Sequence, residues 1–277
     1  MTKQKIDRYA VMGNPIAHSK SPQIHQQFAK QTSQNLSYEK ILVDPENFTQ
    51  DVANFQFHNG KGLNITVPLK EKAFELATHL TERARRAKAV NTLILVDENN
   101  ITGDNTDGIG LVRDLTENYN TELTDKDILI LGAGGAVRGI LEPFIQQKPS
   151  RLVIANRTLA RAQDLAADFS DIAKIDVYEF SQLKGQQFDI IINGTSASLS
   201  GELPPLPDHL ISNNGTTYDM MYGKDDTPFM KWSRNNNAST IIDGLGMLVE
   251  QAAESFYCWR EVRPNTKQVI KDIRESL

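Results

Sequence analysis

The hydrophobic positions of this chain fall into short apolar runs, and segments with helical spacing separate them. Runs of four to eight residues bounded by glycine, proline or polar residues are typical of buried strands. Strands are predicted over Tyr9–Gly13, Leu36–Val43, 61–67, Ala89–Val96, Ile101–Gly103, Ile128–Leu131, Arg151–Ala155, Ile175–Phe180, Phe188–Asn193, Thr217–Tyr222 and Thr240–Asp243. Helices are predicted over Pro22–Thr32, Phe48–Phe57, Glu71–His79, Thr81–Lys88, Ile109–Asn118, Pro228–Arg234, the segment that ends near Gln146, and a long C-terminal segment from Gly244. The alternation of the two patterns predicts an α/β fold.

One strand-to-helix junction has the order that a dinucleotide-binding turn requires. The apolar run Ile128–Leu131 ends in Gly132-Ala133-Gly134-Gly135-Ala136, and a helical pattern follows. Gly132 permits a tight turn, Gly134 lets the backbone approach a pyrophosphate, and the helix N-terminus offers free N–H groups. The third glycine of the G-x-G-x-x-G pattern is replaced by Val137. Nucleotide binding and an ordinary tight turn therefore both remain open at this point.

The end of the next strand indicates which dinucleotide would bind. An NAD site carries an acidic residue there, about 20 residues past the glycines, which accepts from the ribose 2′-hydroxyl. This chain has Asn156 and Arg157, with Arg161 one helical turn further on. Guanidinium groups recognise phosphate through paired hydrogen bonds, so the pattern favours the 2′-phosphate of NADP(H). The alternative is a pair of solvent-facing arginines.

A second candidate anion site lies near the N-terminus. Ser21 followed by Pro22 is a helix-start pattern, with serine as N-cap and proline in the first turn. Ser21 can therefore be a plain cap. Alternatively, Ser19, Ser21 and the helix N-terminus form an anion site suited to a carboxylate.

The segment Lys61–Lys70 alternates apolar and polar residues before a helix. One face is predicted to carry Leu63, Ile65 and Val67, and the other Asn64 and Thr66. Lys70 opens the following helix, where the helix dipole favours an anion rather than a cation. Most such lysines are solvated. However, the end of a strand in an α/β sheet is also where such sheets bind ligands.

Asp107 lies in Gly103–Gly108, which superficially resembles a calcium loop. Counted from Asp104, the residues at positions 3, 6 and 12 are not those that a calcium loop requires, so we reject a metal. Asp107 can be a plain N-cap of the next helix or an ionised group beside a substrate. The basic residues of Thr81–Lys88 are predicted to face solvent.

Composition narrows the class of partner. The 277 residues have room for two domains. A net charge of −5 argues against nucleic acid or an anionic membrane as partner. No apolar run approaches the ~20 residues of a membrane span, and the N-terminus lacks the apolar core of a secretory signal. The single cysteine, Cys258, cannot form an internal disulfide and is interpreted as a buried thiol, which suggests a reducing cytoplasm.

Taken together, the motifs resemble the shikimate dehydrogenase family, and its biosynthetic, NADP-linked form is the most similar. The segments that carry the resemblance are Gly13–Pro22, Asn64–Lys70, Ala89–Thr92, Gly103–Gly108, Gly132–Ala136, Asn156–Thr158 and Asp243–Met247. They occur in the order of the family and extend over nearly the whole chain.

The resemblance implies roles that the pattern alone leaves open. Ser19 and Ser21 would bind the substrate carboxylate, with assistance from Tyr222. Asn64, Thr66, Asn91 and Gln251 would hold ring hydroxyls, and Lys70 and Asp107 would be the catalytic pair that also contacts substrate. The cofactor-binding set would be Gly132, Ala133, Gly134, Gly135, Ala136, Asn156, Arg157, Thr158, Arg161, Thr195, Met220, Gly244 and Met247.

The resemblance also implies an architecture and a reaction. An open mixed α/β substrate domain (1–106 plus 244–277) would contain an inserted Rossmann-type doubly wound nucleotide domain (107–243), with a cleft between them. The expected reaction is reversible NADPH-dependent reduction of 3-dehydroshikimate to shikimate, in aromatic amino acid biosynthesis. A monomer or homodimer without a metal is expected. The alternatives are an NAD-tolerant quinate/shikimate dehydrogenase and a non-catalytic NADPH-binding regulator.

Overall fold

The computed structural model describes residues 6–97, 99–195, 197 and 201–277. The sequence also predicts a ligand-side loop over Gly194–Ser198, after the strand Phe188–Asn193, but Ser196 and Ser198 lie outside the described residues, as do residues 1–5. The chain divides into two compact units. Unit 1 ends at Gly110 and resumes over Val249–Ser276, and unit 2 is Leu111–Leu248. The chain leaves unit 1 within helix α5 (Asp107–Arg113) and returns within α9 (Leu245–Arg260). The expected two-part α/β fold is thus confirmed.

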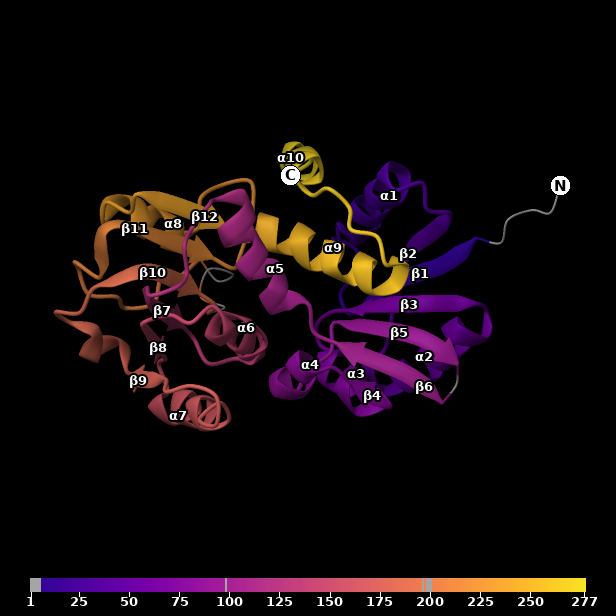
Figure 1. The fold of residues 1–277 in the computed structure, drawn as a ribbon, viewed down its shortest axis with the longest axis horizontal. Helices are drawn as coiled ribbons and strands as arrows, with labels where there is room; N and C mark the ends of the chain where they lie inside the picture. The colour runs from indigo at the N-terminus through magenta and orange to yellow at the C-terminus, as the bar shows by residue number, and fades with distance from the viewer. Residues whose placement is uncertain (1–5, 98, 196, 198–200) are drawn as a thin grey trace. The chain divides into compact units, whose positions relative to one another are not determined.

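Unit 1 is built on a mixed six-stranded sheet with the order β2-β1-β3-β5-β6-β4 (Figure 1). Its strands are β1 (Asp7–Gly13), β2 (Leu36–Leu42), β3 (Gly60–Ile65), β4 (His79–Leu80), β5 (Thr92–Asp97) and β6 (Asn100–Asp104). The strands β1, β2 and β3 are parallel to one another, whereas β5 is antiparallel to both β3 and β6. The parallel strands β1 and β3 therefore end at the same edge of the sheet, where polar side chains follow them.

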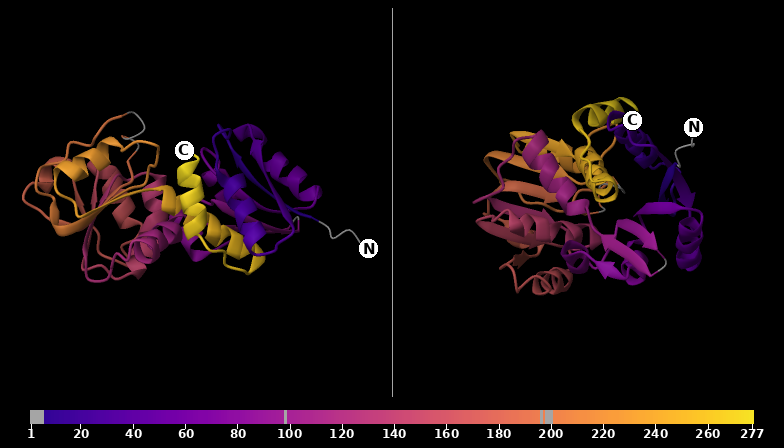
Figure 2. Two further views of the ribbon diagram at one scale, coloured as in Figure 1. Left: turned by 90° about the horizontal axis from the view of Figure 1, so that it is seen from above. Right: turned by 45° about the vertical axis from the view of Figure 1, so that its right-hand side comes forward.

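Helices cover both faces of this sheet. One face packs against α2 (Phe48–Phe57), α3 (Lys70–Leu76) and α4 (Glu82–Ala87), through a core that includes Leu63 and Ile65. The other face packs against α1 (Ser21–Gln31) and α9 through aromatic rings. A last helix, α10 (Lys267–Glu275), lies beside α1 (Figure 2). The Lys20 ammonium at the start of α1 donates to the Ser276 carbonyl.

His25 is buried in the aromatic cluster on the face that α1 covers. Its imidazole stacks on Tyr38, with ring centroids 4.2 Å apart and an interplanar angle of 5°. Its ring also contacts Phe28 and Trp259. The residue is 1% exposed, and no described group meets the geometry of a hydrogen bond to either ring nitrogen. Burial lowers the pKa of His25 to about 3, although the nearby Asn64 amide opposes the shift.

This histidine makes the stability of the fold depend on pH. Because the pKa of His25 in the folded chain lies below its ordinary value of 6.5, the unfolded chain binds a proton that the folded chain excludes. The contribution of neutral His25 to the free energy of unfolding is therefore complete above pH 6.5 and is lost as the pH falls toward 3. We expect His25 alone to decrease the free energy of unfolding by about 2 kcal/mol between pH 7 and pH 5. Denaturant titrations at both pH values measure this decrease, and an equal decrease in the His25→Phe variant would contradict the assignment.

Unit 2 is built on an all-parallel six-stranded sheet with the order β12-β11-β10-β7-β8-β9. Its strands are β7 (Asp127–Leu131), β8 (Arg151–Ala155), β9 (Asp176–Tyr178), β10 (Phe188–Asn193), β11 (Ile211–Asp219) and β12 (Thr240–Asp243). Strand order reverses beside β7, where β10 pairs with its other edge. This is the strand order of the Rossmann fold, which binds ligands beyond the strand ends at the reversal.

Alternate residues of β7 face two different cores. Ile128 and Ile130 pack with α5, α6 (Gly135–Gln146) and α7 (Leu159–Ala167). Leu129 and Leu131 pack with α8 (Pro228–Asn235) and a short 3₁₀ helix (Phe180–Leu183) on the opposite face. A five-residue π-helix, Asp114–Asn118, continues α5. Strands buried on both faces explain why the pattern along β7, β8 and β10 is continuously apolar rather than alternating.

The structure corrects several predicted boundaries. The helix that Lys70 opens ends at Leu76 instead of His79, and His79–Leu80 form a strand. Val67 lies beyond the end of β3 and is 67% exposed, so it does not share the buried face of Leu63. The sequence pattern did not predict α10.

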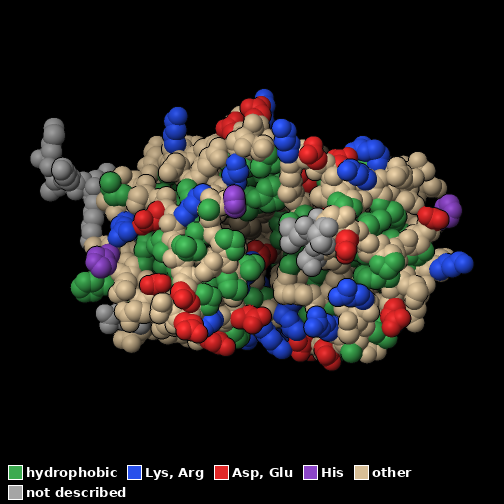
Figure 3. Space-filling model, turned by 180° about the vertical axis from the view of Figure 1, so that it is seen from behind, with side chains coloured by type: hydrophobic (Ala, Val, Ile, Leu, Met, Phe, Trp, Pro, Cys, Tyr) green, Lys and Arg blue, Asp and Glu red, His purple; other side chains and the backbone are tan. Residues whose placement is uncertain are grey.

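Figure 3 shows acidic and basic side chains interspersed over the face that it draws. Within the described ranges, no helix is long and apolar enough to cross a bilayer.

Candidate active site

Lys70 and Asp107 form an ion pair in unit 1. Lys70 is the first residue of α3 and Asp107 the first residue of α5. The Lys70 Nζ donates to Asp107 Oδ2 over 2.6 Å. The side chains are 29% and 14% exposed, so both are shielded but reachable. Lys70 can therefore hold or deliver one proton while the carboxylate of Asp107 keeps its ammonium in place. A fully solvated lysine would have no such fixed position.

Asn91 holds the second carboxylate oxygen of Asp107. Its Nδ2 donates to Asp107 Oδ1 over 2.8 Å and to the Gln251 side-chain oxygen over 3.3 Å. The backbone N–H of Thr106 donates to Asn91 Oδ1, which fixes the orientation of the amide. The structure thus brings together four predicted site residues, Lys70, Asn91, Asp107 and Gln251.

The residues before Asp107 position it, and the sequence reasoning assigned them no role. Asn105 accepts from the Asp107 backbone N–H, and it donates to the carbonyl of Ala89. Asp104 makes a bidentate pair with Arg83 and accepts from the Asn105 N–H. Burial disfavours the ionised form of Asp104, but Arg83 outweighs it and holds the pKa of that carboxyl below its ordinary value. The prediction that the basic residues of Thr81–Lys88 face solvent is therefore wrong for Arg83.

Asn64 is 7% exposed and belongs to a second polar group. Its Oδ1 accepts from the Tyr38 hydroxyl over 2.7 Å. Its Nδ2 donates to the Ser255 hydroxyl over 3.0 Å and to the Asn91 carbonyl over 3.3 Å. Tyr38 and Ser255 were not predicted as site residues, because only the fold brings β2 and α9 to the end of β3.

Ser19 and Ser21 lie together at the start of α1. Lys20 occupies the N-cap position, without a capping hydrogen bond from its side chain, and Ser21 is the first helical residue. The interpretation of Ser21 as a plain N-cap is therefore wrong. The Ser19 hydroxyl instead donates to the Ser21 hydroxyl over 3.1 Å. Two hydroxyls beside the N-terminus of an eleven-residue helix suit a carboxylate.

Thr66 follows β3 and packs against Gly13 at the end of β1. A Cβ added to Gly13 would lie 2.4 Å from the Thr66 Cγ2 atom, so only glycine fits there. The close approach places Thr66 at the strand edge, and its backbone N–H donates to the Met12 carbonyl. The substrate-binding role of its hydroxyl stays a prediction.

The glycine turn of unit 2 leaves open space where a phosphate would bind. Gly132 has φ of +106°, which favours glycine. A Cβ added to Gly134 or Gly135 would meet no described heavy atom within 4 Å. Gly134 is the N-cap of the twelve-residue α6, and it has no side chain that could cap the helix. A cradle of this kind, at the positive end of a helix, fits a pyrophosphate.

Val137 replaces the third glycine of the pattern without closing the turn. Its side chain is fully buried and packs against Gly194, where an added Cβ would lie 2.5 Å from Val137 Cγ2. In the G-x-G-x-x-G pattern, the third glycine leaves space on the surface of the helix. In this chain Gly194, which follows β10, leaves that space instead. The incomplete match therefore does not argue against a nucleotide site.

Arg157 and Arg161 are exposed beside the end of β8. Neither guanidinium makes an ion pair or hydrogen bond with any residue that the structure describes. Arg138, by contrast, pairs with Asp168 over 2.6 Å. Asn156 turns its amide nitrogen to the Thr158 carbonyl, over 2.8 Å. The two free arginines are thus available for a phosphate.

The remaining predicted cofactor residues follow β10, β11 and β12. Thr195 donates to the Asn193 side chain through both its backbone N–H and its hydroxyl. A Cβ added to Gly244 would lie 2.2 Å from the Met220 carbonyl oxygen, so these two residues are in close contact. Met247 is 9% exposed. Burial, together with the charge of Asp243, raises the pKa of Tyr222.

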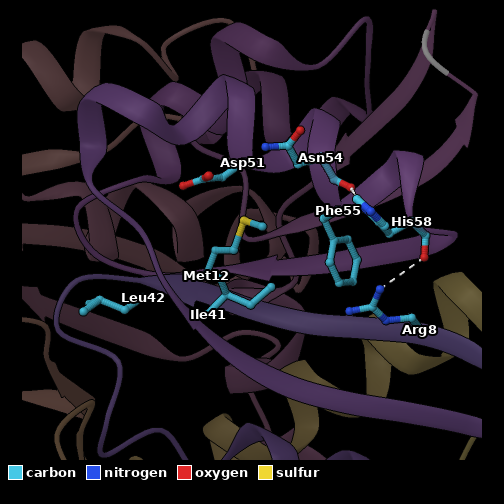
Figure 4. A pocket seen from close by; sticks show the side chains of 8 residues that line it. All are labelled: Arg8, Met12, Ile41, Leu42, Asp51, Asn54, Phe55 and His58. Carbon is cyan, nitrogen blue, oxygen red and sulfur yellow. Dashed lines mark hydrogen bonds between the residues drawn. The ribbon is translucent and has the colours of Figure 1, made fainter.

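A surface pocket in unit 1 contains none of the predicted site residues. It encloses about 400 Å³ between α2 and the β1–β2 edge (Figure 4). Arg8, which lines it, donates to the His58 carbonyl and pairs with Glu39. Within the described residues, no three acidic, histidine or cysteine side chains cluster as a metal site would require.

Family models match most of this chain in three segments. Residues 11–93 match the shikimate dehydrogenase substrate binding domain, and residues 114–200 match shikimate / quinate 5-dehydrogenase. Residues 244–274 match the shikimate 5′-dehydrogenase C-terminal domain.

Individual proteins match over nearly their full lengths. The shikimate dehydrogenase (NADP(+)) of Cellvibrio japonicus is 52% identical, over 98% of both chains. A crystal structure of an Ael1 enzyme from Pseudomonas putida is 47% identical, with a TM-score of 0.91 over 96% of this chain and 97% of that chain. The shikimate 5-dehydrogenase of Thermus thermophilus in complex with NADP(H) and shikimate is 28% identical, with a TM-score of 0.87 over 98% of this chain and 100% of that chain.

Proposed function

This chain belongs to the shikimate dehydrogenase family, and we propose that Lys70 and Asp107 carry out the proton transfer of its reaction. The chain is an NADP-dependent oxidoreductase that acts on a CH–OH group. The reaction is the reversible NADPH-dependent reduction of 3-dehydroshikimate to shikimate. The observation that carries the assignment of the pair is the 2.6 Å contact between Lys70 Nζ and Asp107 Oδ2, with Asn91 on the other carboxylate oxygen.

The protein must manage one proton and the charge that develops on the substrate oxygen. When bound, NADPH supplies the hydride. Lys70 carries transferable protons on a positive group, so it stabilises the developing alkoxide and donates a proton to it. Asp107 accepts hydrogen bonds from Lys70 and Asn91, so it orients the lysine and can accept from a substrate hydroxyl. In the reverse direction, neutral Lys70 removes the hydroxyl proton.

The cofactor-binding roles follow from unit 2. The open space above Gly134 and Gly135 fits the pyrophosphate, and the free guanidinium groups of Arg157 and Arg161 fit the 2′-phosphate. We therefore assign the Rossmann-type domain, residues 107–243, to NADP(H). We assign Thr195, Met220, Gly244 and Met247, which follow the strand ends, to the remainder of the cofactor.

We assign the substrate-binding roles mainly to residues of unit 1, and we propose that residues 1–106 plus 244–277 form the substrate domain. Ser19 and Ser21 suit the carboxylate, because both hydroxyls lie at the N-terminus of α1. The ring hydroxyls are assigned to Asn64, Thr66, Asn91 and Gln251, and Tyr222 to the carboxylate. We further propose a cytoplasmic monomer or homodimer, for which the single cysteine and the biosynthetic reaction are the support.

A spectrophotometric assay tests the reaction and separates its alternatives. Pure protein is mixed with NADP⁺ and shikimate, and the appearance of reduced nicotinamide is measured. The assay is repeated with NAD⁺ and with quinate. We expect turnover with NADP⁺ and shikimate that exceeds turnover in the other combinations. Comparable rates with NAD⁺ and quinate would instead indicate the quinate/shikimate enzyme, and cofactor binding without turnover would indicate a regulator.

A further inference from the structure

Tyr38 connects two groups of residues that are assigned to the substrate. It lies in β2 and is 5% exposed. Its hydroxyl donates to Asn64 Oδ1 over 2.7 Å. Burial raises the pKa of the Tyr38 phenol, and the Ser21 hydroxyl opposes this shift, which indicates that Ser21 lies near the phenol oxygen. Tyr38 therefore lies between the assigned carboxylate site and the residue assigned to a ring hydroxyl.

The hydrogen-bond directions around Asn64 follow from its partners. The Asn91 carbonyl can only accept, so the Asn64 atom that faces it over 3.3 Å is the amide nitrogen. The amide oxygen must then face Tyr38, whose single hydroxyl proton is used in this bond. Tyr38 consequently can only accept from Ser21, so the single proton of the Ser21 hydroxyl is directed at the phenol oxygen while no ligand is bound. Asn64 retains one oxygen lone pair, so it can accept from a substrate hydroxyl but cannot easily donate.

Aromatic packing holds the Tyr38 ring in place. His25 stacks on it at 4.2 Å, and Trp259 lies at 6.4 Å on the same face of the sheet. Because neither nitrogen of His25 has a described hydrogen-bond partner, this imidazole acts as a flat packing surface and does not compete for the Tyr38 hydroxyl. The ring plane, and with it the direction of the hydroxyl, is therefore fixed before a ligand binds.

We propose that Tyr38 is a positioning residue for substrate recognition. Its hydroxyl fixes the Asn64 amide so that the amide oxygen accepts from one ring hydroxyl of shikimate. The inference rests on the proposed role of Asn64 and goes beyond it, because it assigns both the direction of that hydrogen bond and the residue that sets it.

The Tyr38→Phe variant tests the proposal, because it removes one hydroxyl and keeps the stacked ring. The buried Asn64 oxygen loses its partner and its fixed position, so we expect the Kd of shikimate to rise roughly 5- to 30-fold. The KM of shikimate should rise with it, whereas kcat and the KM of NADP⁺ stay near wild type. This split distinguishes positioning of the substrate site from a general loss of stability, which would not act on one ligand alone.

Tyr9→Phe is a matched control. Tyr9 in β1 pairs directly with Tyr38 in β2, is 2% exposed, and contacts Trp259 in a tilted arrangement with ring centroids 4.7 Å apart. Its hydroxyl accepts from Arg260 over 3.3 Å and has no contact with Asn64 among the described residues. This variant loses a hydroxyl from another buried tyrosine of the same aromatic cluster. We expect it to leave the Kd of shikimate unchanged.

Substrate analogues test the direction of the hydrogen bond. Binding of 4-deoxyshikimate and 5-deoxyshikimate to wild type and to Tyr38→Phe is measured by calorimetry. For the analogue that lacks the hydroxyl bound by Asn64, the variant should bind as well as wild type, because the contact is already absent. The other analogue should show the same loss as shikimate.

Three outcomes overturn the proposal. If Tyr38→Phe binds shikimate like wild type while Asn64→Ala binds it weakly, Tyr38 does not position the amide and the proposed function stands. If Asn64→Ala also binds shikimate normally, the assignment of Asn64 to the substrate fails as well. If Tyr9→Phe weakens shikimate binding as much as Tyr38→Phe does, the effect belongs to the aromatic cluster and not to the Asn64 bond.

Discussion

Lys70→Ala is expected to lower kcat by ~10²–10⁴-fold, the usual contribution of a general acid or base. The 2.6 Å bond to Asp107 fixes the ammonium, and alanine leaves no group that can donate to the substrate oxygen. Steady-state assays with shikimate and NADP⁺ measure the change. Lys72→Ala is the matched control, because Lys72 is an exposed lysine in the same helix and should keep its kcat.

The kinetic constants separate catalysis by Lys70 from simple binding. Loss of a group that acts mainly in the transition state lowers kcat and kcat/KM together. A Lys70→Ala enzyme with normal kcat and a raised KM would show that the lysine only binds substrate. Asp107→Asn provides a second comparison, since the amide keeps the shape of the side chain but cannot hold the ammonium as an ion pair.

Removal of both Arg157 and Arg161 is expected to weaken NADP⁺ far more than NAD⁺. Each charge-assisted hydrogen bond contributes about 1.5–3 kcal/mol, so the loss of even one exceeds tenfold. NAD⁺ lacks the 2′-phosphate, so its KM should change little. Kinetic titrations of both cofactors with the double alanine variant measure the difference.

Arg234→Ala is a suitable control for the cofactor experiment. Arg234 is an arginine of the same unit that pairs with Asp226 over 2.6 Å, and its loss should affect neither cofactor. An equal rise in both KM values for the Arg157 and Arg161 variant would contradict recognition of the 2′-phosphate.

Local pattern was sufficient for most of the sheets. The runs at Arg151–Ala155 and Phe188–Asn193 match β8 and β10 residue for residue, because strands buried on both faces have an unmistakable apolar pattern. The glycine turn was also recognisable from the sequence, because its geometry depends only on neighbouring residues. The two-residue β4 and the terminal helix α10 depend on distant partners, and no local signal indicated them.

The candidate site was only partly readable from sequence. Lys70 could be selected as an unusual charge at a helix start, Asp107 as either a plain N-cap or an ionised group beside a substrate, and the resemblance paired them. The contact between Tyr38 and Asn64 joins residues 26 positions apart across β1, and the contact with Ser255 joins residues 191 apart. Such contacts depend on the order of the strands in the sheet and on the return of α9 to unit 1. Neither can be read from the spacing of residues along the sequence. The prediction for Arg83 was wrong because the basic run around it was interpreted as solvent-facing. In the structure Arg83 pairs with the buried Asp104.

The discontinuity of unit 1 has a consequence for biosynthesis of the chain. One face of its sheet is covered by α9, whose Phe256 and Trp259 pack on the rings of α1, β1 and β2. A ribosome makes Leu111–Leu248 before it makes Val249–Ser276. The inserted unit therefore has its complete sequence, and can fold, while the N-terminal part still lacks the covering of its aromatic face. Until the last segment emerges, that apolar surface stays uncovered and prone to aggregation.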